Sequence, residues 1–173
     1  MIDSESLSRQ LLDQLTDSNE LTPAWRDAFA SVPRQVFIPD TIWRNDGDGL
    51  VPLHRTEDPQ AWMQRAWGDR AVVTQVDDGH PAGPGQLGRY VTSSASQPNV
   101  VALMLDALDA EHGMTVCEIG TGTGYNAALL AHRLGAENVT SIEIDPQLAG
   151  QARQALATAG YPVTVVTADG TDA

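Results

Sequence analysis

A glycine-rich turn and three acidic residues are the part of the sequence whose spacing could do chemistry. Glu118 stands just before the turn "GTGTG" (120–124), Glu143 comes 19 positions after its last glycine, and Asp169 lies near the end of the sequence. Glycines let a backbone turn sharply and approach a ligand without a Cβ in the way. An acid at a strand end can accept two hydrogen bonds from ribose hydroxyls, which is the role predicted for Glu143. Asp169 is predicted to accept a hydrogen bond from an exocyclic amine such as that of adenine.

The spacing of the glycines discriminates among ligands that contain adenosine. A dinucleotide fingerprint has the pattern G-x-G-x-x-G and seats a pyrophosphate on a helix N-terminus. Here the third glycine comes one place early, and the carboxylate of Glu118 would repel a pyrophosphate but suits an ammonium group. A phosphate-binding P-loop is excluded because no Gly-Lys-Ser/Thr follows. The pattern therefore favours S-adenosylmethionine over a nucleotide-dependent oxidoreductase, and a purely structural tight turn is the remaining alternative.

The predicted cofactor-binding residues belong to the turn and to the three strand ends. They are Glu118, Gly120, Thr121, Gly122, Gly124, Tyr125, Glu143, Ile144, Asp169 and Gly170. S-adenosyl-L-homocysteine would be the product. No metal site is predicted, because the four histidines show no metal spacing and the pair Asp77 and Asp78 is typical of a turn.

Alternating strands and helices must position these residues. The patterns predict strands over 114–119, 138–145 and 163–170, with a helix over 124–135 and another that Asp145 caps, Pro146 opens and Gly160 ends. Alternation of this kind predicts the α/β class, with a mostly parallel sheet and ligands beyond the carboxyl ends of its strands. Cys117 is expected to be a buried, inert thiol inside the first of these strands.

The first half of the chain is less regular. Leucines at helical spacing predict a helix over 4–15, and a second helix is predicted from Pro23, with Thr22 as its N-cap and Pro33 at its end. Glycines and prolines punctuate residues 40–90, where we predict one strand (71–76) followed by a loop (77–85). Order returns with a helix that Pro98 opens. We expect residues 1–92 to form a helical and loop-rich cap that contributes to substrate binding, and residues 93–173 to form half of a cofactor-binding domain.

Composition and charge limit the classes of protein. The 173 residues include 23 acids and 10 Lys plus Arg, for a formal charge of −13, so neither a nucleic acid nor an anionic membrane is an expected partner. The weak basic clusters around Arg34, Arg44 and Arg65 are interrupted by acids. The acidic surface is interpreted as solubilising, with attraction of a basic partner or substrate as the alternative. The polar N-terminus is not a secretory signal, and a cytoplasmic location is expected.

Three further segments resemble a known family. The segment "SVPRQVFIP" (31–39) is similar to a Val-Pro-Arg-x-x-Phe-x-Pro signature, "SSASQP" (93–98) to a Thr-Ile-Ser-Gln-Pro segment, and "AWGDRAV" (66–72) to an Ala-Tyr-x-Asp stretch. With the glycine turn, they make the chain resemble the protein-L-isoaspartate O-methyltransferase family of class I S-adenosylmethionine methyltransferases. The resemblance covers about residues 5–39 and 66–173, and residues 40–65 look like extra sequence.

The resemblance implies a Rossmann-like, doubly wound fold and a carboxyl O-methyltransferase. Its substrates would be aspartyl or isoaspartyl side chains of a peptide or protein, and the methyl ester would cyclise to a succinimide (aspartimide). The resemblance places Ser96 near the methyl-transfer centre as the catalytic residue, with Ser94 and Gln97 binding substrate. Ser96 could also be a helix N-cap beside Pro98.

Details of the sequence narrow the resemblance. "VVTQVDDG" (72–79) and "TSSASQP" (92–98) are closer to an actinobacterial branch associated with ribosomally made, modified peptides, whose members methylate an aspartate in a constrained peptide. The chain stops just after its third predicted strand, which suggests a fragment of a longer protein. A homodimer is expected if the chain truly ends at Ala173. A fragment that binds S-adenosylmethionine or assists assembly without catalysis is the alternative function.

Overall fold

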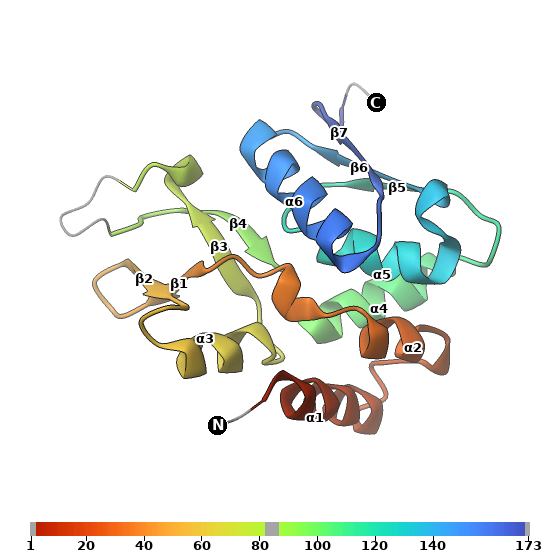
Figure 1. The fold of residues 1–173 in the computed structure, drawn as a ribbon, viewed down its shortest axis with the longest axis horizontal. Coiled ribbons are helices and arrows are strands. Elements are labelled where there is room, and N and C mark those ends of the chain that lie inside the picture. The colour runs from red at the N-terminus through yellow and green to blue at the C-terminus, as the bar shows by residue number, and fades with distance from the viewer. Residues whose placement is uncertain (1–2, 82–86, 172–173) are drawn as a thin grey trace.

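Two β-sheets with separate helical layers make up the computed structural model of the chain, which describes residues 3–81 and 87–171 (Figure 1). The first sheet is antiparallel with strand order β2-β1-β3-β4, and the second is parallel with order β5-β6-β7. In chain order the elements are α1 (Ser4–Asp17), α2 (Pro23–Ser31), η1 (Arg34–Val36), β1 (Thr41–Asn45), β2 (Leu50–His54), α3 (Pro59–Ala66), β3 (Val72–Val76), η2 (Asp77–Gly79), β4 (Val91–Ala95), α4 (Pro98–Leu108), β5 (Val116–Ile119), α5 (Tyr125–Leu134), η4 (Ala136–Asn138), β6 (Val139–Glu143), α6 (Pro146–Ala159) and β7 (Thr164–Thr167).

The parallel sheet confirms the prediction made from the alternating pattern in residues 114–170. Residues in register across the sheet include Ile119, Ile142 and Val166, and the crossover helices α5 and α6 connect the strands. The helix ends have the expected chemistry. The Asp145 side chain accepts hydrogen bonds from two backbone N–H groups in the first turn of α6, and Gly160 ends that helix in the left-handed conformation.

The N-terminal helices share one hydrophobic core with the parallel sheet. Both α1 and α2 form where the apolar spacing predicted them, and α2 packs on α4 and α5. Leu15, Trp25 and Phe29 are buried in the same cluster as Leu129 and Leu130 of α5. Thr22 occupies the N-cap position of α2, as predicted, although its side chain makes no capping hydrogen bond.

Residues 40–66 are more regular than predicted. They form the hairpin β1–β2 and the helix α3, which with β3 and β4 bury a second core around Ile42 and Trp62. The indole Nε1 of Trp62 donates to the carbonyl of Pro39 at 3.0 Å. The hairpin was not predicted because proline is a signal against a strand. Pro52 nevertheless lies in β2, which is an edge strand, where a missing N–H is tolerated.

Asp77 and Asp78 form a turn after β3, as predicted. Both have positive φ values, and the carboxylate of Asp77 accepts hydrogen bonds from the backbone N–H groups of Arg89 and Tyr90 at 2.9 Å. Residues 82–86 of the predicted loop lie outside the described residues. Within the ranges that are described, no group of His, Cys, Asp and Glu side chains is arranged to hold a metal ion.

The burial predicted for Cys117 was wrong. Its side chain is exposed, and Ile119 on the same strand is 68% exposed. The helices that pack against the parallel sheet cover the opposite face, on which Val139 and Val165 are buried. An apolar strand was therefore correctly predicted at β5, but the side of the sheet that is covered was not visible in the local sequence.

The division of the chain at residues 92 and 93 stays a prediction. Strand β4 lies across it, and α1 and α2 contribute to the same core as α5. No helix among the residues that the structure describes is long and apolar enough to cross a bilayer.

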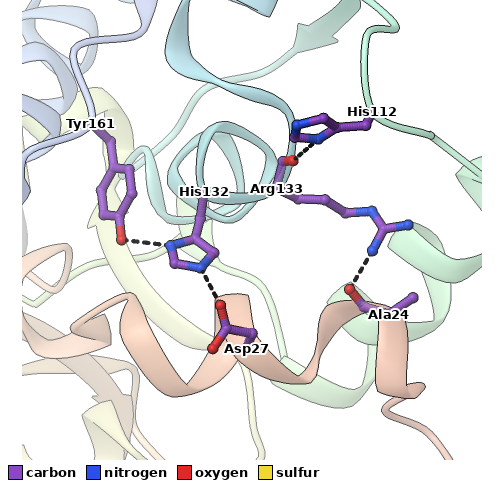
Figure 2. Close-up of polar contacts among 6 residues, drawn as sticks. All are labelled: Ala24, Asp27, His112, His132, Arg133 and Tyr161. Carbon is purple, nitrogen blue, oxygen red and sulfur yellow. Dashed lines mark hydrogen bonds and ion pairs between the residues drawn. The ribbon is translucent and has the colours of Figure 1, made fainter.

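A polar seam joins α2 to α5 and to the connection between α6 and β7 (Figure 2). The ring of His132 lies between two partners, with Nε2 at 2.8 Å from the carboxylate of Asp27 and Nδ1 at 3.0 Å from the hydroxyl of Tyr161. The neighbouring Arg133 donates from Nη1 to the carbonyl of Ala24 and from Nε to a second backbone carbonyl, and its guanidinium lies 4.8 Å from the centre of the Trp25 ring. This seam fixes α2 on the parallel-sheet half of the fold.

Replacing Arg133 by alanine should weaken the attachment of α2. The variant loses two hydrogen bonds to backbone carbonyls and a cation–π contact, so the free energy of unfolding should fall by about 1–3 kcal/mol in urea titrations. Arg9→Ala is the matched control, because Arg9 is an exposed helical arginine whose ion pair with Glu5 spans 3.9 Å. Equal stability losses in the two variants would contradict this role.

Candidate functional site

A cavity of about 290 Å³ lies at the carboxyl end of β5, between the glycine turn and the junction of β4 with α4. Seven of the predicted site residues line it: Ser94, Ser96, Glu118, Gly120, Thr121, Gly122 and Tyr125. The structure therefore places residues 94–96, which were predicted to contact the substrate, and the turn that was predicted to bind a cofactor on the wall of the same cavity.

The glycine turn is held in place by backbone hydrogen bonds and needs glycine at its end. The N–H of Gly120 donates to the carbonyl of Ile142 at 2.8 Å, which ties the turn to β6. Gly124 stands before the first residue of α5 with φ +88°, and a Cβ there would lie 3.2 Å from Cγ of Leu156. A side chain at Gly124 would thus be strained and crowded against α6.

Glu143 ends β6 next to the turn and is buried, with 6% of its surface exposed. One carboxylate oxygen accepts the N–H of Gly122 at 2.8 Å, and the other accepts the N–H of Asp145 at 3.1 Å. Each oxygen keeps a further lone pair, so the carboxylate can still accept hydrogen bonds from two hydroxyl groups. Glu143 both orients the turn and presents an acceptor beside it.

A chain of hydroxyl groups leads from the turn to Glu118. Ser141 donates to one oxygen of the Glu118 carboxylate, and because a hydroxyl carries a single proton, Thr121 must donate to Ser141, over 2.6 Å. Asn126 donates to the other oxygen of Glu118 at 2.7 Å. These contacts fix the Glu118 carboxylate at the wall of the cavity.

The environment of Glu118 disfavours its charged form. Burial raises the pKa of its carboxyl group, the hydrogen bonds from Ser141 and Asn126 oppose that rise, and the nearby Glu143 adds to it. Glu118 lines the cavity, and Glu143 lies close behind the turn without lining it, so negative charge is concentrated at this end of the cavity. A bound cation would offset that charge.

The other predicted cofactor residues lie outside the cavity lining, at neighbouring strand ends. Ile144 is 68% exposed after β6. Asp169 is exposed after β7, and hydrogen bonds from Thr171 lower the pKa of its carboxyl group. Gly170 lies against Ile119, since a Cβ built on it would come within 2.5 Å of that side chain. The segment after β7 therefore contacts the last residue of β5.

Two side chains from distant segments hold the wall on which Ser96 stands. Arg34, with 0% of its surface exposed, donates from Nη2 to the carbonyl of Ser96 at 3.0 Å and from Nε to the carbonyl of Ala66 at 2.8 Å. Its guanidinium lies 4.7 Å from the centre of the Tyr125 ring. Arg34 therefore links η1, α3, the start of α4 and the start of α5.

Asp69 holds the other side of this wall. Its carboxylate accepts the backbone N–H of Asn99 at 2.9 Å and the side-chain amide of Gln97 at 3.4 Å. Gln97 is thus engaged with Asp69 and does not line the cavity. Gln97, and not Ser96, occupies the N-cap position of α4, so the alternative interpretation of Ser96 as a cap was wrong.

Several of these residues were missed in the sequence. Ser141 is a buried polar residue two positions before Glu143 on the same strand, and that spacing was a signal that both face the turn. Asn126, Arg34 and Asp69 gave no such signal. Their partners are 8, 62 and 30 positions away, a separation that no local pattern reveals.

Comparison with known proteins identifies the family. The family model for protein-L-isoaspartate(D-aspartate) O-methyltransferase matches residues 59–173. The chain belongs to this family. The expected family resemblance and α/β fold are thereby confirmed.

Two members of the family give the extent of the similarity. The chain is 32% identical over 171 residues to protein-L-isoaspartate O-methyltransferase 1 of Archaeoglobus fulgidus, a match that covers 98% of this chain and 63% of that protein. It is 42% identical over 146 residues to the protein-L-isoaspartate O-methyltransferase of Ignicoccus hospitalis, covering 83% of this chain and 53% of that protein. The chain thus spans less than two thirds of these family members. Residues 40–65, expected to be extra sequence, lie inside the span matched in Archaeoglobus fulgidus.

Solved structures of the family have the same fold. A protein-L-isoaspartate O-methyltransferase aligns with a TM-score of 0.65 and 25% identity, over 94% of this chain and 42% of that one. A putative family member from Plasmodium falciparum, in complex with S-adenosyl-L-homocysteine, aligns with a TM-score of 0.61 and 14% identity, over 92% of this chain and 62% of that one. At that identity the second likeness concerns the fold alone.

Replacing Glu118 by glutamine should change how stability depends on pH. Because the pKa of Glu118 is raised in the folded state, the native protein loses stability as the pH rises above about 4 and the buried carboxyl group ionises. Glutamine avoids this cost and can still bond to Ser141 and Asn126. The variant should be more stable than the wild type near pH 7, and the difference should shrink toward pH 4. Thermal unfolding of both proteins between pH 4 and pH 7 measures this difference in stability. A difference that does not change with pH would contradict the raised pKa of Glu118.

Proposed function

We propose that the protein is an S-adenosylmethionine-dependent carboxyl O-methyltransferase that acts on aspartyl or isoaspartyl side chains of a peptide or protein. The observation that carries the proposal is the cavity that joins Glu118 and the glycine turn to Ser94 and Ser96. Membership of the family supports the same reaction class. The proposed location is the cytoplasm, with no nucleic acid or membrane as partner.

The residues present fit S-adenosylmethionine. A Cβ built on Gly120 meets no atom within 4 Å, so open space adjoins the turn. The Glu118 carboxylate would bind the ammonium group of the cofactor, and Glu143 would accept bonds from its ribose hydroxyls. Ile144, Asp169 and Gly170 would complete the adenosine end.

When bound, S-adenosylmethionine supplies an activated methyl group for transfer to a carboxylate oxygen. A substrate carboxylate has a pKa near ~4 and is already ionised at neutral pH, so no general base is required. The protein must orient the acceptor and exclude water, and orientation is worth up to about 7–11 kcal/mol in favourable systems. We assign Ser96 to the methyl-transfer centre, with Ser94 on the acceptor side, while Gln97 supports this segment through Asp69. Arg34 and Asp69 hold this segment rigid through its backbone.

The proposed product is a methyl ester that cyclises. A methoxide leaves more readily than an oxide, so the following backbone amide nitrogen can attack the ester carbonyl and give a succinimide, or aspartimide. The segments 72–79 and 92–98 favour an aspartyl residue in a ribosomally made, constrained peptide over isoaspartate in damaged proteins.

A second candidate function is cofactor binding or assembly without methyl transfer. It is favoured by the three strands of the parallel sheet in the described residues. The edge of β7, which among the described residues pairs only with β6, would also suit a homodimer.

One experiment separates the two functions. The full chain is incubated with methyl-labelled S-adenosylmethionine and with matched peptides that contain asparagine, aspartate or isoaspartate at one position, and mass spectrometry follows the methyl ester and its succinimide. Label on an acidic peptide and none on the asparagine peptide supports the enzyme. Cofactor binding in calorimetry without label on either acidic peptide supports the second function, and absence of binding contradicts both.

Replacing Glu143 by alanine should weaken cofactor binding more than it disturbs folding. The variant loses a charged acceptor for two hydroxyl groups, so the Kd for S-adenosyl-L-homocysteine should rise about 10- to 100-fold in calorimetry. Glu143→Gln keeps an oxygen for the N–H of Gly122, and Glu57→Ala removes an exposed acid elsewhere. An unchanged Kd in a folded Glu143→Ala variant would sink the assignment.

A further inference from the structure

Three arginines gather around one cavity on the antiparallel-sheet half of the protein. Arg44 of β1, Arg65 of α3 and Arg70, which follows α3, line a cavity of about 310 Å³. This arginine cavity shares no lining residue with the cavity beside the glycine turn. It is thus a separate feature that the proposed methyl transfer does not use.

A cluster of three arginines is unusual in a chain with so few basic residues. The chain has 10 Lys plus Arg against 23 acids, so three cations around one small cavity are a local reversal of the overall charge. The sequence suggested weak basic clusters at Arg34, Arg44 and Arg65. In the fold, Arg34 is separate from Arg44 and Arg65, because it is buried beside Tyr125. Arg70 joins Arg44 and Arg65 around the cavity.

The three guanidinium groups are not neutralised by neighbouring acids. Within the described part of the chain, no carboxylate lies within ion-pair distance of Arg44, Arg65 or Arg70. The one acid on the cavity wall, Asp58, caps α3 by accepting the N–H of Ala61 at 2.9 Å. Burial, and then the positive charges of Arg70 and Arg44, lower the pKa of Arg65.

We propose that the arginine cavity binds an oxyanion, either a phosphate group or the carboxylates of an acidic peptide segment. Guanidinium groups present planar forks of N–H donors that match both kinds of anion, and charge-assisted hydrogen bonds of this type are among the strong ones in proteins. The volume exceeds what one carboxylate fills and falls at the small end of ligand pockets. The favoured ligand therefore carries two or more negative charges, as pyrophosphate and a run of aspartates do.

Binding of defined anions to the full chain tests this proposal. Calorimetry at low salt uses pyrophosphate, a tetra-aspartate peptide and a tetra-asparagine peptide as probes. The variant Arg44→Gln/Arg65→Gln/Arg70→Gln should lose at least tenfold in affinity for the anionic probe that binds, and added salt should weaken binding to the wild type. Arg9→Gln/Arg26→Gln/Arg89→Gln is the control, since it removes the same charge from exposed positions outside the cavity.

Each outcome of these titrations either supports the proposed site or contradicts it. The site is supported if one or both anions bind to the wild type and only the cavity variant loses affinity. The anion that binds then identifies the kind of oxyanion that the cavity accepts. Absence of binding by both anions, equal loss in the control, or equal binding of tetra-asparagine overturns it. Arg44→Gln and Arg70→Gln change exposed residues one at a time, so they keep the test decisive if the triple variant fails to fold.

Discussion

The buried guanidinium of Arg34 is the interaction on which the rest of the structure depends. A charge removed from water is costly unless hydrogen bonds compensate it, so this side chain determines where its acceptors must lie. The acceptors are the backbone carbonyls of Ala66 and Ser96, and the aromatic face of Tyr125 completes its surroundings. Four segments far apart in the sequence are held together by one side chain. Burial lowers the pKa of Arg34, which expresses the same cost of desolvation.

This arrangement explains why the segments that resembled the family are scattered along the chain. Segment 31–39 supplies Arg34, segment 66–72 supplies Asp69, and both act on the backbone of residues 96–99. The glycine turn faces that backbone across the cavity, and its own position depends on β6 through Ile142 and Glu143. The cavity is therefore bounded by one wall that the N-terminal half positions and one that the parallel sheet positions. Neither half forms it alone.

The errors made from the sequence share a physical cause. The hairpin β1–β2 was missed because its glycines and Pro52 are local signals for loops, while its stability comes from pairing with β3 and from burial of Ile42 and Trp62. Cys117 was placed in the core because an apolar strand has two faces, and only the packing of helices decides which face is covered. In both cases the deciding contacts are tertiary.

Local patterns determined the α/β class, the helices that connect the parallel strands, the glycine turn and the acids at the ends of those strands. These follow from short-range constraints: the period of apolar residues, the capping of helices by Asp145 and Gly160, and the backbone freedom of Gly124. Tertiary structure alone decided that Ser141 bridges Thr121 and Glu118, that Asp69 holds the Ser96 wall, and that three arginines surround a cavity in an acidic protein. The reason is that these contacts join residues separated by up to dozens of positions, and only the folded backbone brings them within hydrogen-bonding or Coulombic range.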